Sequence, residues 1–341
     1  MLDEQQLREI RGWLEKAQNP VFFFDNDVDG LVSFLLLQRF IGRGRGVAIK
    51  SFPQLDKGYA RKISEFKPDV IFILDKPMVD RQFFEAAALE NIPIVWIDHH
   101  PLQETPENVY YYNPLEGEHV SSEPVSYLCY KVVRKDLWLA AVGCVSDCFI
   151  PDFMDEFRKK YPDLVNGMET AQDIFYKTEL GKIATIFLFG LKDTTTNVVK
   201  MLRALEQAKD PYEILSGEKK YETMIKRYEF LNKKFEKLFE KADEAAKHSR
   251  KMVFFKYEGE TKMSSEISNK LIYKYPDKIV IAANIHGEKA NMSLRGMRVR
   301  MLLENALEKV EGRGGGHEEA CAASVKADDL ERFVDAIKTQ L

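Results

Sequence analysis

The sequence lacks the features that mark membrane proteins, secreted proteins and proteins that coat DNA. It has no run of 18 apolar residues that could span a bilayer, and its first residues, Met1 to Gln5, are acidic rather than signal-like. Its four cysteines suggest no disulfide framework. The formal net charge of −4 argues against a dedicated DNA-coating protein. We therefore expect a cytoplasmic protein with no membrane association.

What is present is typical of a globular protein with more than one core. Apolar residues make up 45% of the chain and charged residues 30%. A chain of 341 residues is long enough for two domains. Residues 218–300 hold 20 Lys or Arg against 12 Asp or Glu, which leaves the remainder acidic. This basic segment could bind a polyanion, or its helical part could simply face water.

Three apolar runs are each followed by acidic residues, at positions 25–30, at Asp75 and at positions 98–100. Such runs are typical of buried strands, and the carboxyl ends of parallel strands meet at one crevice. Carboxylates this close raise one another's pKa unless a cation compensates, so the pattern predicts a metal site. Carboxylate mixed with imidazole suits manganese or zinc-like ions better than magnesium alone. A second interpretation makes Asp29 the N-cap of a helix over residues 31–40.

Strand and helix patterns alternate through the first part of the chain, which predicts an α/β fold with a parallel, doubly wound sheet. A buried helix from Leu137 to Cys148 would bring Asp147 to the same crevice. Residues 150–217 have a mostly helical pattern, and residues 218–250 contain one long helix. Residues 251–341 alternate again, as a smaller mixed α/β domain of about 90 residues.

The long helix carries an apolar stripe at alternating three- and four-residue steps. The stripe consists of Tyr221, Met224, Tyr228, Leu231, Phe235, Leu238, Ala242 and Ala245. By default it packs on its own chain. Because it carries aromatic residues and has few obvious internal partners, we also hypothesise self-association through residues 221–245.

Two further expectations concern local structure. Ser121 and Ser122 precede a helical pattern and are expected as its N-caps. The glycines at 314–316 are expected to form a loop between a helix and a strand.

Taken in order, the motifs resemble those of the DHH phosphoesterases. The resemblance rests on residues 25–30, Asp75, the Asp-His-His-Pro motif at 98–101, Asp147 and the Gly-Gly-Gly-His motif at 314–317. More narrowly, the chain looks like the branch with a DHH-associated C-terminal domain, which holds RecJ-like exonucleases, nano-RNases and related phosphatases. In family terms, residues 1–217 are the catalytic domain with a helical cap at 150–217. Residues 218–250 are then a connector, and residues 251–341 the substrate-binding domain.

The resemblance implies two divalent ions, with manganese in first place. The implied metal ligands are Asp25, Asp27, Asp29, Asp75, His99 and Asp147. Asp27, with Asp25 nearby, would bind one ion, Asp75 would bridge, and the other three would bind the second ion. Some members carry a His where this chain has Phe23, and we expect Asp25 to serve instead.

The same resemblance implies a catalytic pair and a substrate-binding set. Asp98 would orient an imidazole, and His100 would bind the phosphate or protonate the leaving oxygen. The substrate-binding residues would be Arg295, Gly314, Gly315, Gly316 and His317. A run of glycines lets backbone amides approach an anion, although a flexible turn explains it equally well.

The function implied is a manganese-dependent phosphodiesterase, in the first place a RecJ-like exonuclease specific for single strands of DNA or RNA. An alternative is a nano-RNase or nucleoside bisphosphate phosphatase that acts on very short substrates. A third interpretation is a non-catalytic scaffold in a replication or repair complex. The partners expected are single-stranded nucleic acid or short oligonucleotides, a second copy of the chain, and a replication or repair protein.

Overall fold

The chain forms two compact units, Met1–Tyr228 and Glu229–Leu341. The computed structural model describes residues 1–51, 53–116 and 120–341. Within these ranges, no helix is both long and apolar enough to cross a lipid bilayer.

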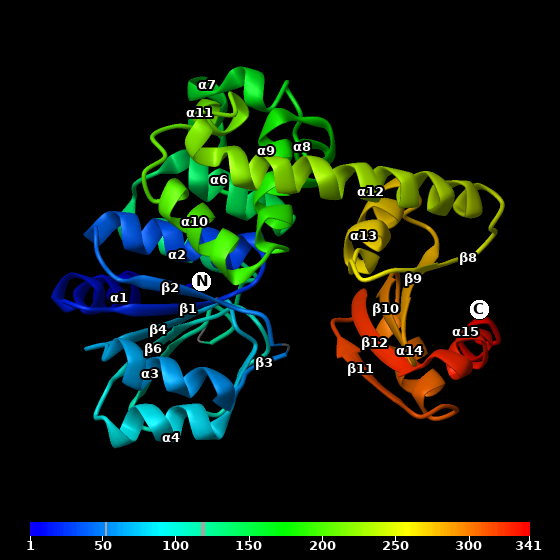
Figure 1. Cartoon of the computed structure of the whole chain (residues 1–341), viewed down its shortest axis with the longest axis horizontal. Helices are drawn as coiled ribbons and strands as arrows, with labels where there is room; N and C mark the ends of the chain where they lie inside the picture. The colour runs from blue at the N-terminus through cyan, green and yellow to red at the C-terminus, as the bar shows by residue number, and fades with distance from the viewer. Residues whose placement is uncertain (52, 117–119) are drawn as a thin grey trace. The chain divides into compact units, whose positions relative to one another are not determined.

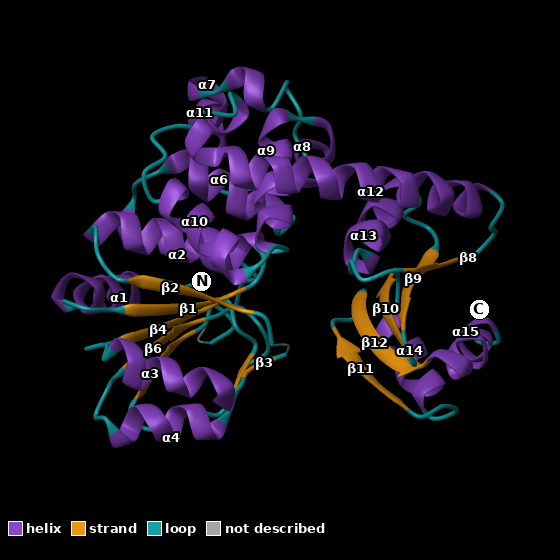
Figure 2. Ribbon diagram, viewed as in Figure 1, coloured by secondary structure: helices purple, strands orange, loops and turns teal. Residues whose placement is uncertain are grey.

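The first unit is built on a five-stranded sheet in the order β2-β1-β4-β6-β7 (Figures 1 and 2). The strands are β1 (Val21–Asp25), β2 (Arg45–Ile49), β4 (Ile71–Leu74), β6 (Ile94–Ile97) and β7 (Val109–Tyr112). Each pairs with its neighbours in parallel. The predicted parallel sheet is therefore confirmed. A separate two-stranded sheet pairs β3 (Gln54–Leu55) with β5 (Met78–Val79).

Both faces of this sheet are covered, which is why its strands are apolar throughout. Side chains alternate along a strand, so Phe22 and Phe24 enter one core while Val21 and Phe23 enter the other. Figure 1 shows α1 and α2 on one side of the sheet and α3 and α4 on the opposite side. The helices that cover the sheet are α1 (Glu4–Lys16), α2 (Val28–Ile41), α3 (Arg61–Phe66), α4 (Arg81–Leu89), α5 (Val125–Val133) and α6 (Leu137–Ser146).

Residues 150–217 are mostly helical, as expected. The helices are α7 (Met154–Lys160), α8 (Ala171–Lys177), α9 (Glu179–Leu191), α10 (Thr195–Leu205) and α11 (Pro211–Leu215). Leu180, Ile183 and Phe187 of α9 are buried in the same core as α2 and α6. This region therefore extends the core on one face of the sheet.

A long helix, α12 (Glu222–Lys247), begins in the first unit and ends in the second. Its apolar stripe follows the prediction as far as Phe235 and then differs, because Phe239 and Ala246 are buried where Leu238 and Ala245 were expected. The Phe239 ring stacks on Phe235 one turn earlier, with 5.9 Å between centroids. Since these side chains are covered within the chain, self-association through this helix stays a prediction.

The second unit is a mixed sheet in the order β11-β12-β10-β9-β8. Its strands are β8 (Met252–Glu258), β9 (Ile279–His286), β10 (Lys289–Arg295), β11 (Gly312–Gly316) and β12 (Ala320–Lys326). Only the β8–β9 pair is parallel. Helix α13 (Ser264–Lys274) packs on β9 and β10, while α14 (Val299–Leu307) and α15 (Leu330–Lys338) share a core with the opposite face.

The glycine run in this unit is a strand, so the expected loop is wrong. Strand β11 lies at the sheet edge and pairs antiparallel with β12, with Gly315 opposite Ala322. At Gly316, φ is 145° and a Cβ would lie 2.3 Å from the Ala320 carbonyl oxygen. Glycine is therefore needed at Gly316 for close approach of two strands, which composition alone reads as a turn.

The loop after β1 is equally close-packed, and this generates a stability prediction. A Cβ on Gly30 would lie 2.6 Å from the carbonyl oxygen of Asp25 and 2.8 Å from its nitrogen. We expect Gly30→Ala to lower the free energy of unfolding by about 1–3 kcal/mol, because backbone must move. Gly12→Ala on α1, where nothing lies within 4 Å of the new Cβ, should instead add roughly 0.5–1 kcal/mol. Urea unfolding of both variants measures the contrast, and equal effects would contradict it.

Candidate metal centre

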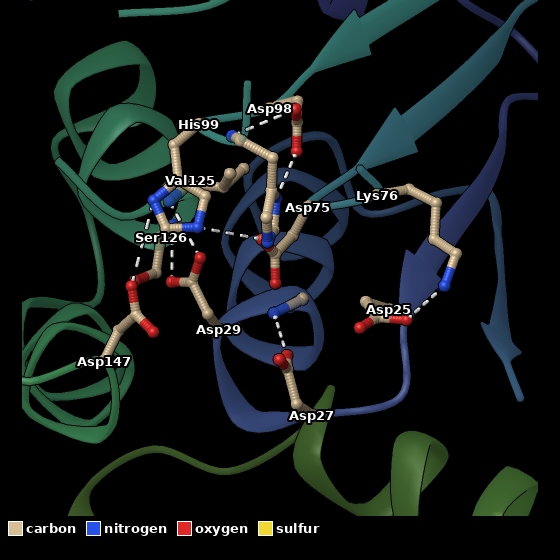
Figure 3. Close-up of polar contacts among 12 residues, drawn as sticks. Asp25, Asp27, Asp29, Asp75, Lys76, Asp98, His99, Val125, Ser126 and Asp147 are labelled. Carbon is tan, nitrogen blue, oxygen red and sulfur yellow. Dashed lines mark hydrogen bonds and ion pairs between the residues drawn. The ribbon is translucent and has the colours of Figure 1, made fainter. Parts of the chain in front are cut away.

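The carboxyl ends of three neighbouring strands supply the acidic residues of the first unit. Asp25 is the last residue of β1, Asp75 follows β4, and Asp98 follows β6. Asp147 arrives from the other direction, as the C-cap of α6. Figure 3 shows Asp29, Asp75 and Asp147 around His99. The crevice predicted at this end of the sheet is therefore where these side chains meet.

Asp27, not Asp29, is the N-cap of α2. Its Oδ1 atom accepts a hydrogen bond of 2.9 Å from the backbone N–H of Gly30. The interpretation of Asp29 as a cap for residues 31–40 is wrong because the helix begins at Val28. The position of the Asp27 carboxylate is therefore tied, through one oxygen, to the first turn of α2.

Asp29 is buried and receives the start of a different helix. Its two carboxylate oxygens accept hydrogen bonds from the backbone N–H groups of Val125, at 2.8 Å, and Ser126, at 2.9 Å. These are the first residues of α5, whose N-cap is Pro124 and has no side-chain cap of its own. The expectation that Ser121 and Ser122 cap this helix is therefore wrong. A carboxylate 96 residues away does so instead, and no local pattern indicates it.

Two groups of three side chains could each hold a metal ion. One consists of Asp75, His99 and His100, and the other of Asp29, His99 and Asp147. In each group one ligand atom per residue lies within 4.8 Å of the others. His99 joins the groups, with Nε2 at 3.4 Å from Asp75 Oδ1 and Nδ1 at 3.9 Å from Asp147 Oδ2.

Asp98 holds His100 from two directions. The His100 Nδ1 atom lies 2.8 Å from Asp98 Oδ1, and the His100 backbone N–H donates to Asp98 Oδ2 at 3.1 Å. Asp98 is fully buried, and Asn113 donates to the same Oδ2 atom. Burial by itself would lower the pKa of His100, but the hydrogen bond and charge of Asp98 outweigh it and raise that pKa.

The remaining acids are crowded and dry, and their pKa values rise accordingly. Burial, followed by the charges of Asp25 and Asp29, raises the pKa of Asp27 to about 8. Burial and the charge of Asp147 raise the pKa of Asp29 to about 6. Burial, followed by the charge of Asp27, holds the pKa of Asp75 well above its ordinary value. Such a set of carboxylates is stable in its charged form only beside a compensating cation.

Asp75 gives the most direct indication of a ligand. Its Oδ1 atom is buried, and it accepts no hydrogen bond from the described residues. Its φ of 58° is in the left-handed region that few residues other than glycine adopt. Strained backbone of this kind is concentrated at functional sites. Carboxylate and imidazole donors around this atom fit a divalent transition-metal ion.

Asp25 lies apart from both groups. Its Oδ1 atom is 2.6 Å from Nζ of Lys76, a lysine that is 0% exposed (Figure 3). The sequence analysis missed Lys76, although its position directly after Asp75 was a signal for it. Asp25 was expected near the first ion, and its nearest charge is instead an ammonium group.

The expected substrate-binding residues lie close together within the second unit. Arg295 ends β10 opposite Ala320 of β12, and its Nε donates to Asn269 Oδ1 at 2.6 Å. The glycines of β11 lie on the other side of β12, and all are exposed. A Cβ on Gly315 would meet nothing within 4 Å, so packing does not explain the missing side chain there. His317 follows at the turn into β12, where its N–H donates to Ala320.

Comparison with known proteins identifies the class of fold. The DHHA1 domain family matches residues 249–341. RecJ from Thermus thermophilus in complex with Mn²⁺ is 17% identical with a TM-score of 0.68; the match covers 99% of this chain and 55% of RecJ. An exonuclease RecJ bound to manganese is 14% identical with a TM-score of 0.67, covering 99% and 95%. The DHH domain of a member of a ribosomal protein family is 15% identical with a TM-score of 0.66, covering 98% and 89%.

The chain thus has the α/β fold of the RecJ and DHH proteins, and spans about half the length of the Thermus RecJ. Residues 249–341 are a DHHA1 domain, and the combined matches support a DHH-family phosphoesterase with a C-terminal DHHA1 domain. No curated protein sequence matches the chain significantly.

The raised pKa values predict that a metal ion and pH act together on stability. Because the pKa of Asp27 is about 8 in the folded chain and 3.8 ordinarily, the folded state binds more protons between these values. The free energy of unfolding of the metal-free protein therefore falls as pH rises from about 4 to 8. Manganese should raise the melting temperature more at pH 8 than at pH 6, because it displaces fewer protons there.

Thermal melts in EDTA and in MnCl₂ between pH 5.5 and 8.5 measure both effects. Asp27→Asn should flatten the profile in EDTA, while Asp152→Asn, a change at an exposed side chain, should not. A metal-free protein that becomes more stable across this range would contradict the prediction.

Proposed function

We propose that the protein is a metal-dependent phosphodiesterase, and more narrowly a manganese-dependent, RecJ-like exonuclease on single-stranded nucleic acid. The observation that carries the proposal is the pair of three-residue groups that share His99 at the carboxyl edge of the sheet. A phosphodiester resists hydrolysis because its charge repels nucleophiles and its leaving oxygen is poor. Both difficulties are met by a site that holds two cations at the reacting phosphate.

The chain offers donors for two ions. Asp29, His99 and Asp147 would hold one, and Asp27 the other, with Asp75 between them. Asp27 lies outside both three-residue groups, but its raised pKa, to which the charges of Asp25 and Asp29 contribute, supports its place beside a cation. Asp25 is also outside both groups, and its lysine partner makes it the weakest member of the proposed set. Bound cations would activate water and neutralise charge on the attacking and leaving oxygens.

Asp75 is proposed as the bridge. Its Oδ1 atom is buried and accepts no hydrogen bond from the described residues, which supports a cation as its partner. The largest charge effect on its raised pKa comes from Asp27, and the next from Asp29. Asp75 is therefore close enough to both proposed ion sites to interact with each.

His100 would act on the leaving group. Asp98 holds its Nδ1 atom and raises its pKa, so the imidazole keeps a proton to higher pH. With Nδ1 held in this way, proton transfer to a leaving oxygen would use Nε2. Asp98 is then the residue that fixes the ring, and His100 the general acid.

The DHHA1 domain would bind the nucleic acid. Arg295 can hold a phosphate through a planar guanidinium, and its position is fixed by Asn269 and by the Leu294 carbonyl oxygen. The exposed edge of β11 offers backbone N–H groups to an anion at Gly314–Gly316, next to His317. The excess of Lys and Arg in residues 218–300 favours a long polyanion over a dinucleotide.

The burial of the acids argues against a scaffold without catalysis. Asp29 and Asp75 are 3% and 2% exposed, and their pKa values are raised. A chain with no use for a cation would gain stability by replacing them with apolar or neutral residues. A protein partner in replication or repair is compatible with the exonuclease and is part of the proposal.

Three substrates separate the candidate activities: a single strand of about 30 nucleotides labelled at its 5′ end, the same strand labelled at its 3′ end, and a labelled dinucleotide. With manganese, we expect progressive shortening of the long strand, and the label released first gives the direction. Cleavage of the dinucleotide alone would replace the proposal by the nano-RNase alternative. No cleavage of any of them, with metal bound, would favour the scaffold.

The division of roles predicts different kinetic defects. Asp75→Ala and His100→Ala should lower kcat by roughly 10²–10⁴-fold, because each removes a group needed in the transition state. Arg295→Ala should instead raise KM about 10- to 100-fold, which is the usual value of a charge-assisted hydrogen bond. Lys289→Ala, an exposed change on the same strand, is the control. Full activity in His100→Ala would refute the general-acid role.

A further inference from the structure

We propose that Lys76 and Asp25 form a positioning pair that shapes the metal centre, and that Asp25 is therefore not a metal ligand. The Nζ atom of Lys76 lies 2.6 Å from Asp25 Oδ1 and donates to the Ser51 carbonyl oxygen at 2.7 Å. The lysine is 0% exposed, and the Asp25 side chain is 18% exposed. The inference rests on the proposed function in that it concerns the same metal centre.

Lys76 connects the carboxyl ends of four strands. Its backbone follows β4, and its carbonyl oxygen accepts a hydrogen bond of 3.0 Å from Trp96 Nε1 on β6. Its ammonium group reaches Asp25 at the end of β1 and Ser51 just beyond β2. Because the backbone and the side chain are both held, the ammonium is a fixed cation at the edge of the crevice.

The pair acts on the metal centre through the turn that follows β1. Asp25 is the first residue of this turn, and Asp27, which caps α2, is the third. The Asp25 backbone also lies against Gly30, with no room for a Cβ between them. A shift of Asp25 would therefore displace Asp27, which is a proposed ligand. On the other side, Lys76 follows directly after Asp75, so the pair adjoins both proposed ligands.

An ammonium and a divalent cation are poor neighbours on one carboxylate. The Asp25 Oδ1 atom already contacts a positive charge in a buried setting, where electrostatic interactions are strong. A metal ion on the same carboxylate would be repelled by the lysine at short range. Removing either partner leaves a buried charge uncompensated, so the two residues should behave as one unit when they are mutated.

The test is manganese binding without substrate, measured by titration calorimetry on Lys76→Met, Asp25→Asn and the double variant. We expect each single change to weaken binding about 10- to 100-fold, as is usual for residues that support a ligand, and the double change to be no worse than the poorer single. Where activity is measured, kcat should fall with little change in KM. The control is the surface pair Lys131 and Asp152, changed to Met and Asn, which should leave binding unchanged.

A second measurement needs no variant and keeps the inference testable if Lys76→Met fails to fold. A crystal structure of the native chain with manganese should show Asp25 still paired with Lys76 and absent from the coordination of either ion. Asp25 bound to manganese there would overturn the proposal. Unchanged or tighter manganese binding in Lys76→Met, with weaker binding in Asp25→Asn, would overturn it too.

Failure of the proposed function has a different signature. If the native chain binds manganese and the variants weaken that binding, but no nucleic acid is cleaved, the positioning pair stands and the exonuclease does not. If all variants bind as tightly as the native chain, the pair only stabilises the fold and the inference is wrong, whatever the activity.

Discussion

The structure of the first unit depends on one electrostatic constraint: carboxylates gathered at one edge of a parallel sheet must each find a compensating partner. Parallel strands all end at the same edge, so the acids that follow β1, β4 and β6 converge whether or not their charges favour it. Burial makes the convergence costly, because a charged carboxylate loses its hydration. The pKa values of Asp27, Asp29 and Asp75 are raised for this reason.

The chain satisfies most of these carboxylates by itself, each with a different partner. Asp29 receives the N-terminal amides of α5, Asp98 holds His100, and Asp25 is paired with Lys76. Asp75 keeps a buried oxygen that accepts no hydrogen bond from the described residues. The cation requirement is thus concentrated on the acids around His99, which is what a centre built for a small number of ions requires.

The second unit solves a different problem, which is how to expose backbone to an anion without losing a sheet. Strand β11 lies at the edge, and its glycines leave the outer N–H groups uncovered by side chains. Gly316 is also required by the close approach of Ala320, whereas nothing near Gly315 demands a glycine. The two positions therefore have different causes, which the sequence shows as one uniform run.

The sequence by itself determined the order of elements and the place of the acids, because both are local properties. Apolar periodicity fixes strands and helices, and an acid directly after a strand must lie at the end of the sheet. The partner of each acid was decided by the tertiary structure. Asp29 meets amides 96 residues later, and Asp25 meets a lysine 51 residues later. The register of α12 after Phe235 likewise depends on what packs against it. These pairings arise from packing between distant segments, and no pattern within one segment specifies them.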